Sequence, residues 1–212
     1  MRGRWILIFL AGFAVGFAWA FPMAANAAEL VPLANRMPAS HASAPLPAGF
    51  VSFCMRFAGQ CETDKSKPAR VALTAELWEQ LDQVNQDVNR AIAPEDDLAH
   101  YGRAEYWTIP TDGKGDCEDY ALTKREKLIA AGVSPRALRI ALVRTSRGEG
   151  HAVLTVATDH GDYVLDNLAA NVRSWDNTDY RWIERQDPDN EWAWVSLAPA
   201  APTQAPLVAS HG

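Results

Sequence analysis

The sequence GDCEDY, residues 115–120, places one cysteine among three carboxylates. Burying Cys117 there would desolvate three negative charges beside it, and those charges also disfavour the thiolate that a reactive cysteine needs. The stretch begins a predicted helix that ends near Ala131, because Gly132 and then Pro135 follow. Cys117 therefore lies in the first turn, where unpaired backbone N–H groups and the positive end of the helix dipole favour an anion.

Three acids, Asp116, Glu118 and Asp119, surround this cysteine. At about 100° per residue, Asp116 and Asp119 fall near each other with Glu118 within reach, while the thiol of Cys117 faces elsewhere. A site built only of oxygen ligands favours Ca²⁺, which would also cancel the repulsion between the carboxylates and a thiolate. The alternative is that Asp116 is an N-cap, Asp119 completes a weak capping box and Glu118 complements the dipole. We expect the cation site.

The segments around this helix predict an α+β fold. An amphipathic helix runs from Thr74, a suitable N-cap, through Ile92, and Pro94 terminates it. Because the helices precede the strands, we expect N-terminal helices packed on an antiparallel sheet. The β-rich runs that predict the strands are residues 138–144, 151–158, 163–168, 180–184 and 192–197.

His151 and Asp166 lie on two neighbouring predicted strands and are the candidate base and orienting acid for Cys117. A hairpin with residue 151 opposite residue 166 would bring both side chains together on one face. A tighter turn centred on His160-Gly161 would displace Asp166 by four residues, about 13 Å along the strand. The sequence leaves both registers open. The other histidines are weaker candidates, since they lie in the tails, an acidic loop and a turn: His41, His211, His100 and His160.

The N-terminus has the pattern of a secretory signal. Two arginines precede an apolar run over residues 5–21, and Ala25-Asn26-Ala27 fits the A-x-A cleavage pattern. We predict a signal peptide over residues 1–27 and a periplasmic mature protein, in preference to an uncleaved membrane anchor. Residues 28–49 are rich in Pro and Ala and predict a linker, and residues 197–212 predict a disordered tail.

The cysteines and the charge limit the class of protein further. Cys54 and Cys61 are separated by six residues, so they can close a disulfide in an oxidising compartment, which leaves Cys117 alone. The formal net charge is -6, and no run is dense in Lys or Arg. Nucleic acid is therefore an unexpected partner.

Three motifs together resemble the bacterial transglutaminase-like cysteine proteinases of the LapG type. They are GDCEDYA at 115–121, GHAVLTV at 150–156 and YVLDNL at 163–168, and the similarity extends from about Pro45 to Trp194. The resemblance implies a papain-like or transglutaminase-like core in a peptidase domain over residues 50–196. Position by position, it matches Cys117 to the nucleophile, His151 to the base, Asp166 to the orienting acid, and Asp116, Glu118 and Asp119 to acids of a calcium site.

The function implied by the resemblance is that of an exported, Ca²⁺-dependent cysteine endopeptidase. LapG-type members cleave large surface adhesins, so the expected partners are a protein substrate such as an adhesin and an inner-membrane regulatory protein. Trp107 is expected to line the cleft or to donate its indole N–H to the oxyanion beside the Cys117 backbone N–H, although core packing explains it equally well. The alternatives are amine transfer from the same acyl-enzyme and a catalytically silent, Ca²⁺-stabilised periplasmic binding module.

Overall fold

The computed structural model describes residues 35–38 and 42–197. The predicted signal peptide, part of the predicted linker and the predicted tail beyond Leu197 lie outside these residues. The helices are α1 (Ala48–Arg56), α2 (Ala75–Ala91), α3 (Asp97–Tyr101) and α4 (Cys117–Ala130). The strands are β1 (Ser43–Ala44), β2 (Ala93–Pro94), β3 (Lys114–Gly115), β4 (Leu138–Arg144), β5 (Gly150–Thr158), β6 (Gly161–Leu165), β7 (Arg173–Ser174), β8 (Arg181–Gln186) and β9 (Trp194–Ser196).

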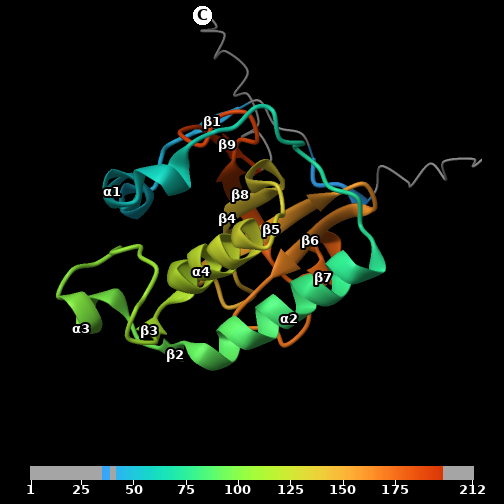
Figure 1. The fold of residues 1–212 in the computed structure, drawn as a ribbon. Coiled ribbons are helices and arrows are strands. Elements are labelled where there is room, and N and C mark those ends of the chain that lie inside the picture. The colour runs from blue at the N-terminus through green and yellow to red at the C-terminus, as the bar shows by residue number, and fades with distance from the viewer. Residues whose placement is uncertain (1–34, 39–41, 198–212) are drawn as a thin grey trace, which may run out of the picture. The chain divides into compact units, whose positions relative to one another are not determined.

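Seven strands form one sheet in the order β1-β9-β8-β4-β5-β6-β7, and every neighbouring pair is antiparallel (Figure 1). The predicted α+β fold with an antiparallel sheet is confirmed. The short strands β2 and β3 pair in parallel as a separate ladder, in which Ala93 N–H donates to Gly113 O and Glu95 N–H donates to Gly115 O. This ladder joins the chain leading into α3 to the chain leading into α4.

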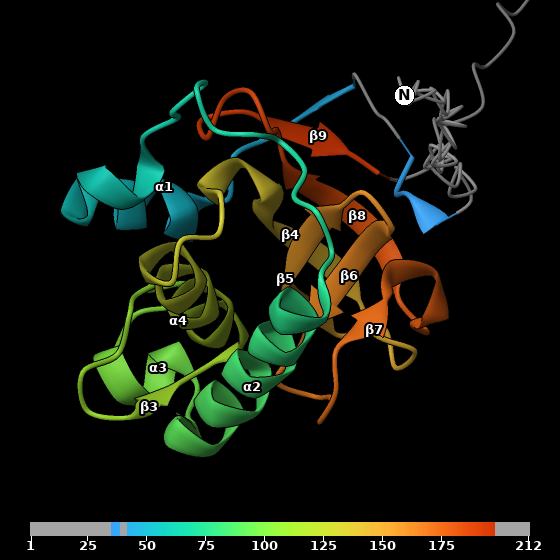
Figure 2. The same ribbon diagram turned by 45° about the vertical axis from the view of Figure 1, so that its right-hand side comes forward.

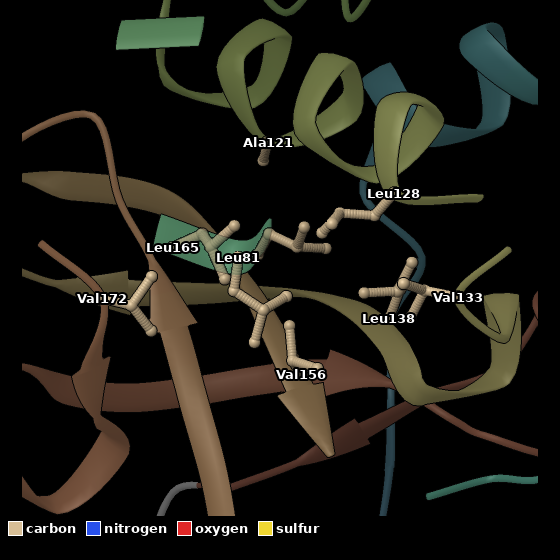
Figure 3. Close-up of a cluster of buried hydrophobic side chains, with 9 residues drawn as sticks. Leu81, Ala121, Leu128, Val133, Leu138, Val156, Leu165 and Val172 are labelled. Carbon is tan, nitrogen blue, oxygen red and sulfur yellow. The ribbon is translucent and has the colours of Figure 1, made fainter. Parts of the chain in front are cut away.

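Two helices cover the sheet beside its central strands. The helix α4 packs against β5 and β4, and α2 packs against α4 and β6 (Figure 2). Apolar side chains from both helices and from the strands meet in a shared core, which Figure 3 shows. The members of this core are Leu81, Ala121, Leu128, Val133, Leu138, Leu154, Val156, Leu165 and Val172.

The helix ends follow the predicted signals. Thr74 Oγ1 accepts a hydrogen bond from Leu77 N–H at 3.2 Å and so begins α2, as predicted. That helix ends at Ala91, three residues before Pro94. The helix α4 runs from Cys117 and ends two residues before Gly132, which has φ +93°. Glycine adopts a positive φ at little energetic cost, so Gly132 lets the chain leave the helix here.

The β5–β6 hairpin has a register that lies between the two that the sequence left open. Thr158 pairs with Gly161 across a two-residue turn, and Leu154 pairs with Leu165. Continued by one position, this register places Asp166 opposite Val153, two residues from His151. Asp166 is also the first residue after β6 rather than part of it. Because the offset is even, His151 and Asp166 still share one face of the sheet.

The N-terminal part of the described chain is more ordered than a linker. Within the predicted linker, β1 pairs with β9 and α1 begins at Ala48, a helix that the sequence reading missed. The predicted disulfide is confirmed, since Cys54 and Cys61 are bonded with their Cα atoms 5.6 Å apart. It links α1 to the following 3₁₀ turn. In the described ranges, no helix combines the length and the apolar character that a bilayer crossing requires.

Two neighbouring cations are buried in α4, Arg125 with an ion-pair partner and Lys124 without one in the described part of the chain. Arg125 is 3 % exposed and pairs with Glu191 at 2.9 Å. Lys124 is 1 % exposed and forms no ion pair within the described part of the chain. Burial lowers the pKa of Lys124 to about 7, against the opposing influence of the Asp166 charge. Charging Lys124 therefore costs free energy in the folded state.

Replacing Lys124 by methionine is expected to raise Tm by about 3–6 °C at pH 7, because folding no longer has to desolvate or deprotonate an ammonium group. In the wild-type chain the pKa of Lys124 falls from its ordinary 10.5 to about 7 on folding. The unfolded chain thus binds more protons between these pH values, so the gain should be largest at and below pH 7 and shrink toward pH 10.5.

Thermal unfolding followed by circular dichroism across this pH range checks the expectation. Lys127→Met is the matched control, because Lys127 is exposed on the same helix and its replacement should leave Tm nearly unchanged. A lower Tm for Lys124→Met would show instead that the ammonium group stabilises the fold.

Candidate active site

A histidine and an aspartate meet at the end of the β5–β6 hairpin. His151 Nε2 lies 2.9 Å from Asp166 Oδ1, and both residues are buried. The two residues are diagonal neighbours across the strands, and diagonal neighbours in a sheet are within reach of longer side chains. The contact engages Nε2 and leaves Nδ1 as the other nitrogen of the His151 ring.

The carboxylate of Asp166 has donors on both oxygens. Oδ1 also accepts the Leu168 backbone N–H at 2.9 Å, and Oδ2 accepts the Tyr180 hydroxyl at 2.5 Å. Burial acts to raise the pKa of Asp166, but the hydrogen bonds from His151, Tyr180 and Leu168 outweigh it and hold that pKa below its ordinary value. Asp166 is therefore an ionised acceptor at neutral pH.

Two asparagines of α2 fix the backbone at Asp166. Asn85 is fully buried, and its Oδ1 accepts the Asp166 backbone N–H at 2.9 Å. Asn89, one turn later, donates from Nδ2 to the Asp166 carbonyl at 2.9 Å. The sequence reading found neither asparagine, although Asn85 interrupts the apolar face of the predicted helix, which was the available signal.

Cys117 is the first residue of α4, as predicted, but its thiol does not face away from the acids. Its Sγ–H donates to Glu118 Oε2 at 2.9 Å, because the long Glu118 side chain reaches back to its neighbour. The Ala152 backbone N–H donates to Sγ at 3.4 Å. Burial raises the pKa of Cys117 well above its ordinary value, and the Glu118 charge raises it further.

Two hollows meet at Cys117 and His151, which line both of them. The first encloses about 280 Å³, and its apolar lining consists of Trp107, Leu142, Val143, Ala152 and Ile183. The second has a polar and acidic lining that includes Glu95, Asp96, Asp116, Thr145, Glu149 and Asn167. An extended peptide therefore has room on both sides of the thiol.

Trp107 lies in the wall of the first hollow and also in the core. Its side chain is 1 % exposed and packs edge-on against Phe50 and Trp194. Its indole N–H donates to Glu105 Oε2 at 3.1 Å, so this donor already has an acceptor. Gly49 makes room for the ring, because a Cβ there would come within 2.3 Å of Trp107. Trp107 therefore both lines the cleft and packs in the core, and its indole N–H is engaged by Glu105 rather than free for an oxyanion.

Carboxylates gather beside the thiol, but not in the expected set. One oxygen each of Asp97, Asp116 and Glu118 lies within 4.8 Å of the others. Asp119 is not a member of this group of three, and its Oδ1 accepts the Thr108 N–H at 2.7 Å. The sequence reading missed Asp97, which lies twenty residues upstream in α3. The acidic triplet over residues 95–97 was the signal for it.

The carboxylates have the donor chemistry and the unmet hydrogen bonds of a calcium site. In the described part of the chain, buried oxygens of Asp97, Asp116 and Asp119 have no hydrogen-bond partner. Asp116 makes no side-chain cap hydrogen bond to α4, contrary to the N-cap alternative. Burial, followed by the nearby carboxylates, raises the pKa of both Asp116 and Asp119 to about 8. Buried oxygens without donors fit a hard cation such as Ca²⁺.

Gly115, the first residue of the GDCED motif, is needed for steric reasons. A Cβ at this position would come within 2.5 Å of Asp119 Oδ2, so the glycine leaves room for that carboxylate under the start of α4. Any larger residue would push the Asp119 side chain out of its place.

Comparisons with known proteins match the chain to one family. The profile described as bacterial transglutaminase-like cysteine proteinase BTLCP matches residues 40–201. Among solved structures, calcium-bound LapG of Legionella pneumophila is similar at 24% sequence identity and TM-score 0.50, covering 61% of this chain and 74% of that one. EGTA-treated LapG of the same organism has 26% sequence identity and a TM-score of 0.49, and the match covers 57% of this chain and 67% of that one. No curated protein matches. The first structural likeness shows the shared fold.

Proposed function

We propose, from the premise that this chain belongs to the bacterial transglutaminase-like cysteine proteinases, that Cys117, His151 and Asp166 form its catalytic triad. Membership makes the chain a transglutaminase-like cysteine peptidase. The observation that carries the triad is the 2.9 Å contact between His151 Nε2 and Asp166 Oδ1 in a cleft that Cys117 also lines. A nucleophile, a base and a group that orients the base are what covalent peptide hydrolysis needs.

The proposed chemistry is acyl transfer through the thiol. His151 takes the Cys117 proton on Nδ1, because Nε2 is held by Asp166, and the sulfur attacks the peptide carbonyl carbon. The same proton then passes from His151 to the leaving amine, and a water molecule hydrolyses the thioester. The backbone N–H of Cys117, in the first turn of α4, is a suitable donor to the oxyanion.

Calcium is the cofactor we propose, held by Asp97, Asp116 and Glu118 with Asp119 beside them. Bound there, the ion neutralises carboxylate charge next to the thiol. The proposal is supported by the buried oxygens that lack partners and by the similar fold of a LapG structure solved with calcium. Without the ion, Glu118 and Asp116 disfavour the thiolate on which attack depends.

We further propose that the mature protein is periplasmic and cleaves a surface protein such as a large adhesin, under an inner-membrane regulatory protein. The signal-like N-terminus, the Cys54–Cys61 disulfide and the LapG-type resemblance support this assignment. Comparing surface proteins of cells with the wild-type chain and with Cys117→Ala tests it. The proposal fails if no surface protein is shortened by the wild-type chain alone.

Alkylation of the thiol tests the triad. Cys117 is the free cysteine, so iodoacetamide labelling followed by mass spectrometry reports on one site. With calcium present, we expect labelling of wild-type protein to persist at pH 6, below the pKa of about 8.5 of an ordinary thiol. The His151→Gln variant should lose this labelling at low pH. The enzymatic role of the thiol is wrong if wild-type Cys117 is labelled with the pH dependence of an ordinary thiol and Cys117→Ala leaves peptide cleavage unaffected.

A further inference from the structure

Tyr180 contacts two members of the proposed triad at once. It precedes β8 and is half-buried, with its hydroxyl donating to Asp166 Oδ2 at 2.5 Å. Its ring and the His151 ring pack in a T-shaped arrangement, with the centroids 5.7 Å apart and the planes at 64°. Burial and the bond to Asp166 raise the pKa of Tyr180 above its ordinary value, so the phenol stays a donor.

The other groups around Asp166 do not replace this donor. Arg173, on β7, has its Nη2 3.5 Å from Oδ2, longer than a hydrogen bond with good geometry, and it is partly exposed. Lys124, buried in α4, acts on Asp166 through charge and forms no ion pair within the described residues. Among these residues, Tyr180 is the hydrogen-bond donor to Oδ2.

We propose that Tyr180 is a positioning residue, which fixes the Asp166 carboxylate and the His151 ring for the reaction of Cys117. The inference rests on the proposed triad. An aspartate carboxylate rotates within a broad torsional well, and the contacts with His151 and the Leu168 N–H both engage Oδ1, so they leave Oδ2 unheld. The bond from Tyr180 holds the second oxygen, and its ring limits the rotation of His151. The effect reaches the thiol only through the histidine.

The test compares Tyr180→Phe with Tyr163→Phe. Tyr163 lies on β6 against Trp78, and its hydroxyl has no hydrogen-bond partner among the described residues, so it is a matched control for the loss of a phenol. We expect Tyr180→Phe to lower kcat by about 10- to 100-fold, the worth of a hydrogen bond to a charged group, with KM within about two-fold. Tyr163→Phe should match the wild type.

Two further readouts separate positioning from general stability. The acid limb of the kcat/KM profile should move to higher pH in Tyr180→Phe, because Asp166 loses a bond that lowers its pKa. The low-field proton resonance of His151 Nε2–H should shift or broaden, whereas Tyr163→Phe leaves it unchanged.

Each result decides the proposal. A kcat within two-fold of wild type, or a loss of kcat with an unmoved acid limb and an unchanged resonance, overturns the role of Tyr180. If Cys117→Ala retains cleavage, the triad itself is wrong. A Tyr180→Phe variant like the wild type, beside an inactive Cys117→Ala, removes only this inference.

Discussion

Replacing Cys117 by alanine is expected to abolish peptide hydrolysis and to leave calcium binding intact. Without Sγ no acyl-enzyme forms, and removing the nucleophile of a catalytic unit of this kind lowers kcat by on the order of 10⁶-fold. The carboxylates that we assign to calcium belong to neighbouring residues, so the ion should still bind. Cleavage of a protein substrate followed by electrophoresis, together with calorimetric titration of calcium, measures both effects.

The serine at position 66 provides a matched control for this variant. Ser66→Ala removes one polar side-chain atom from an exposed turn that lines neither hollow, and we expect full activity. Cleavage by Cys117→Ala above a tenth of the wild-type rate would show that the thiol is not the nucleophile. Loss of calcium heat in Cys117→Ala would show that the substitution disrupts the first turn of α4 rather than the chemistry alone.

Neutralising Asp97 or Asp116 to asparagine is expected to weaken calcium binding by about 100-fold and to lower activity in parallel. Each substitution keeps the shape of the side chain and removes a charge from the ligand set, and ligand charge tunes calcium affinity over several decades. Asp97 is the sharper test, because it belongs to α3 and its replacement does not change the sequence of α4. Calorimetry and cleavage assays at several calcium concentrations, with and without chelator, check the expectation.

Asp112→Asn is the control for these variants. Asp112 is an exposed acid between α3 and β3, and its carboxylate pairs with His100. This variant should bind calcium as the wild type does. Full activity of the wild-type chain in excess chelator, with no heat on calcium addition, would return Asp116, Glu118 and Asp119 to the role of ordinary residues at a helix start.

The sequence predicted those elements whose signals are local. The ends of α2 and α4 depend on Thr74, Pro94 and Gly132, and each acts on its own neighbours. The hairpin register was not predictable in this way. Asp159 and His160 form its turn, and neither supplies the Asn-Gly or Asp-Gly pattern that identifies a two-residue turn.

The parts of the candidate site that were missed are brought close only by the tertiary fold. Asp97 and Asp116 are nineteen residues apart in sequence, and the β2–β3 pairing closes the loop between them. Tyr180 meets Asp166 because it lies in the segment from β7 to β8, which has to pass β6, β5 and β4 in the sheet order. Neither contact leaves a pattern in a window of sequence. The contact of Glu118 with the thiol was missed for another reason, since helix angles place Cα–Cβ bonds and say little about where a long side chain ends.

The parallel ladder of β2 and β3 bears on the energetics of the proposed calcium site. It ties residues 93–94, which lead into α3, to residues 114–115, which lead into α4, and so closes the loop that carries Asp97 back to Asp116. Closing a flexible loop of this length has an entropic cost of about 2–3 kcal/mol. Because the ladder closes the loop during folding, an arriving ion meets carboxylates already gathered and does not have to bear that cost. The burial and crowding that raise the pKa values of Asp116 and Asp119 are then set by folding, and a bound ion would offset them.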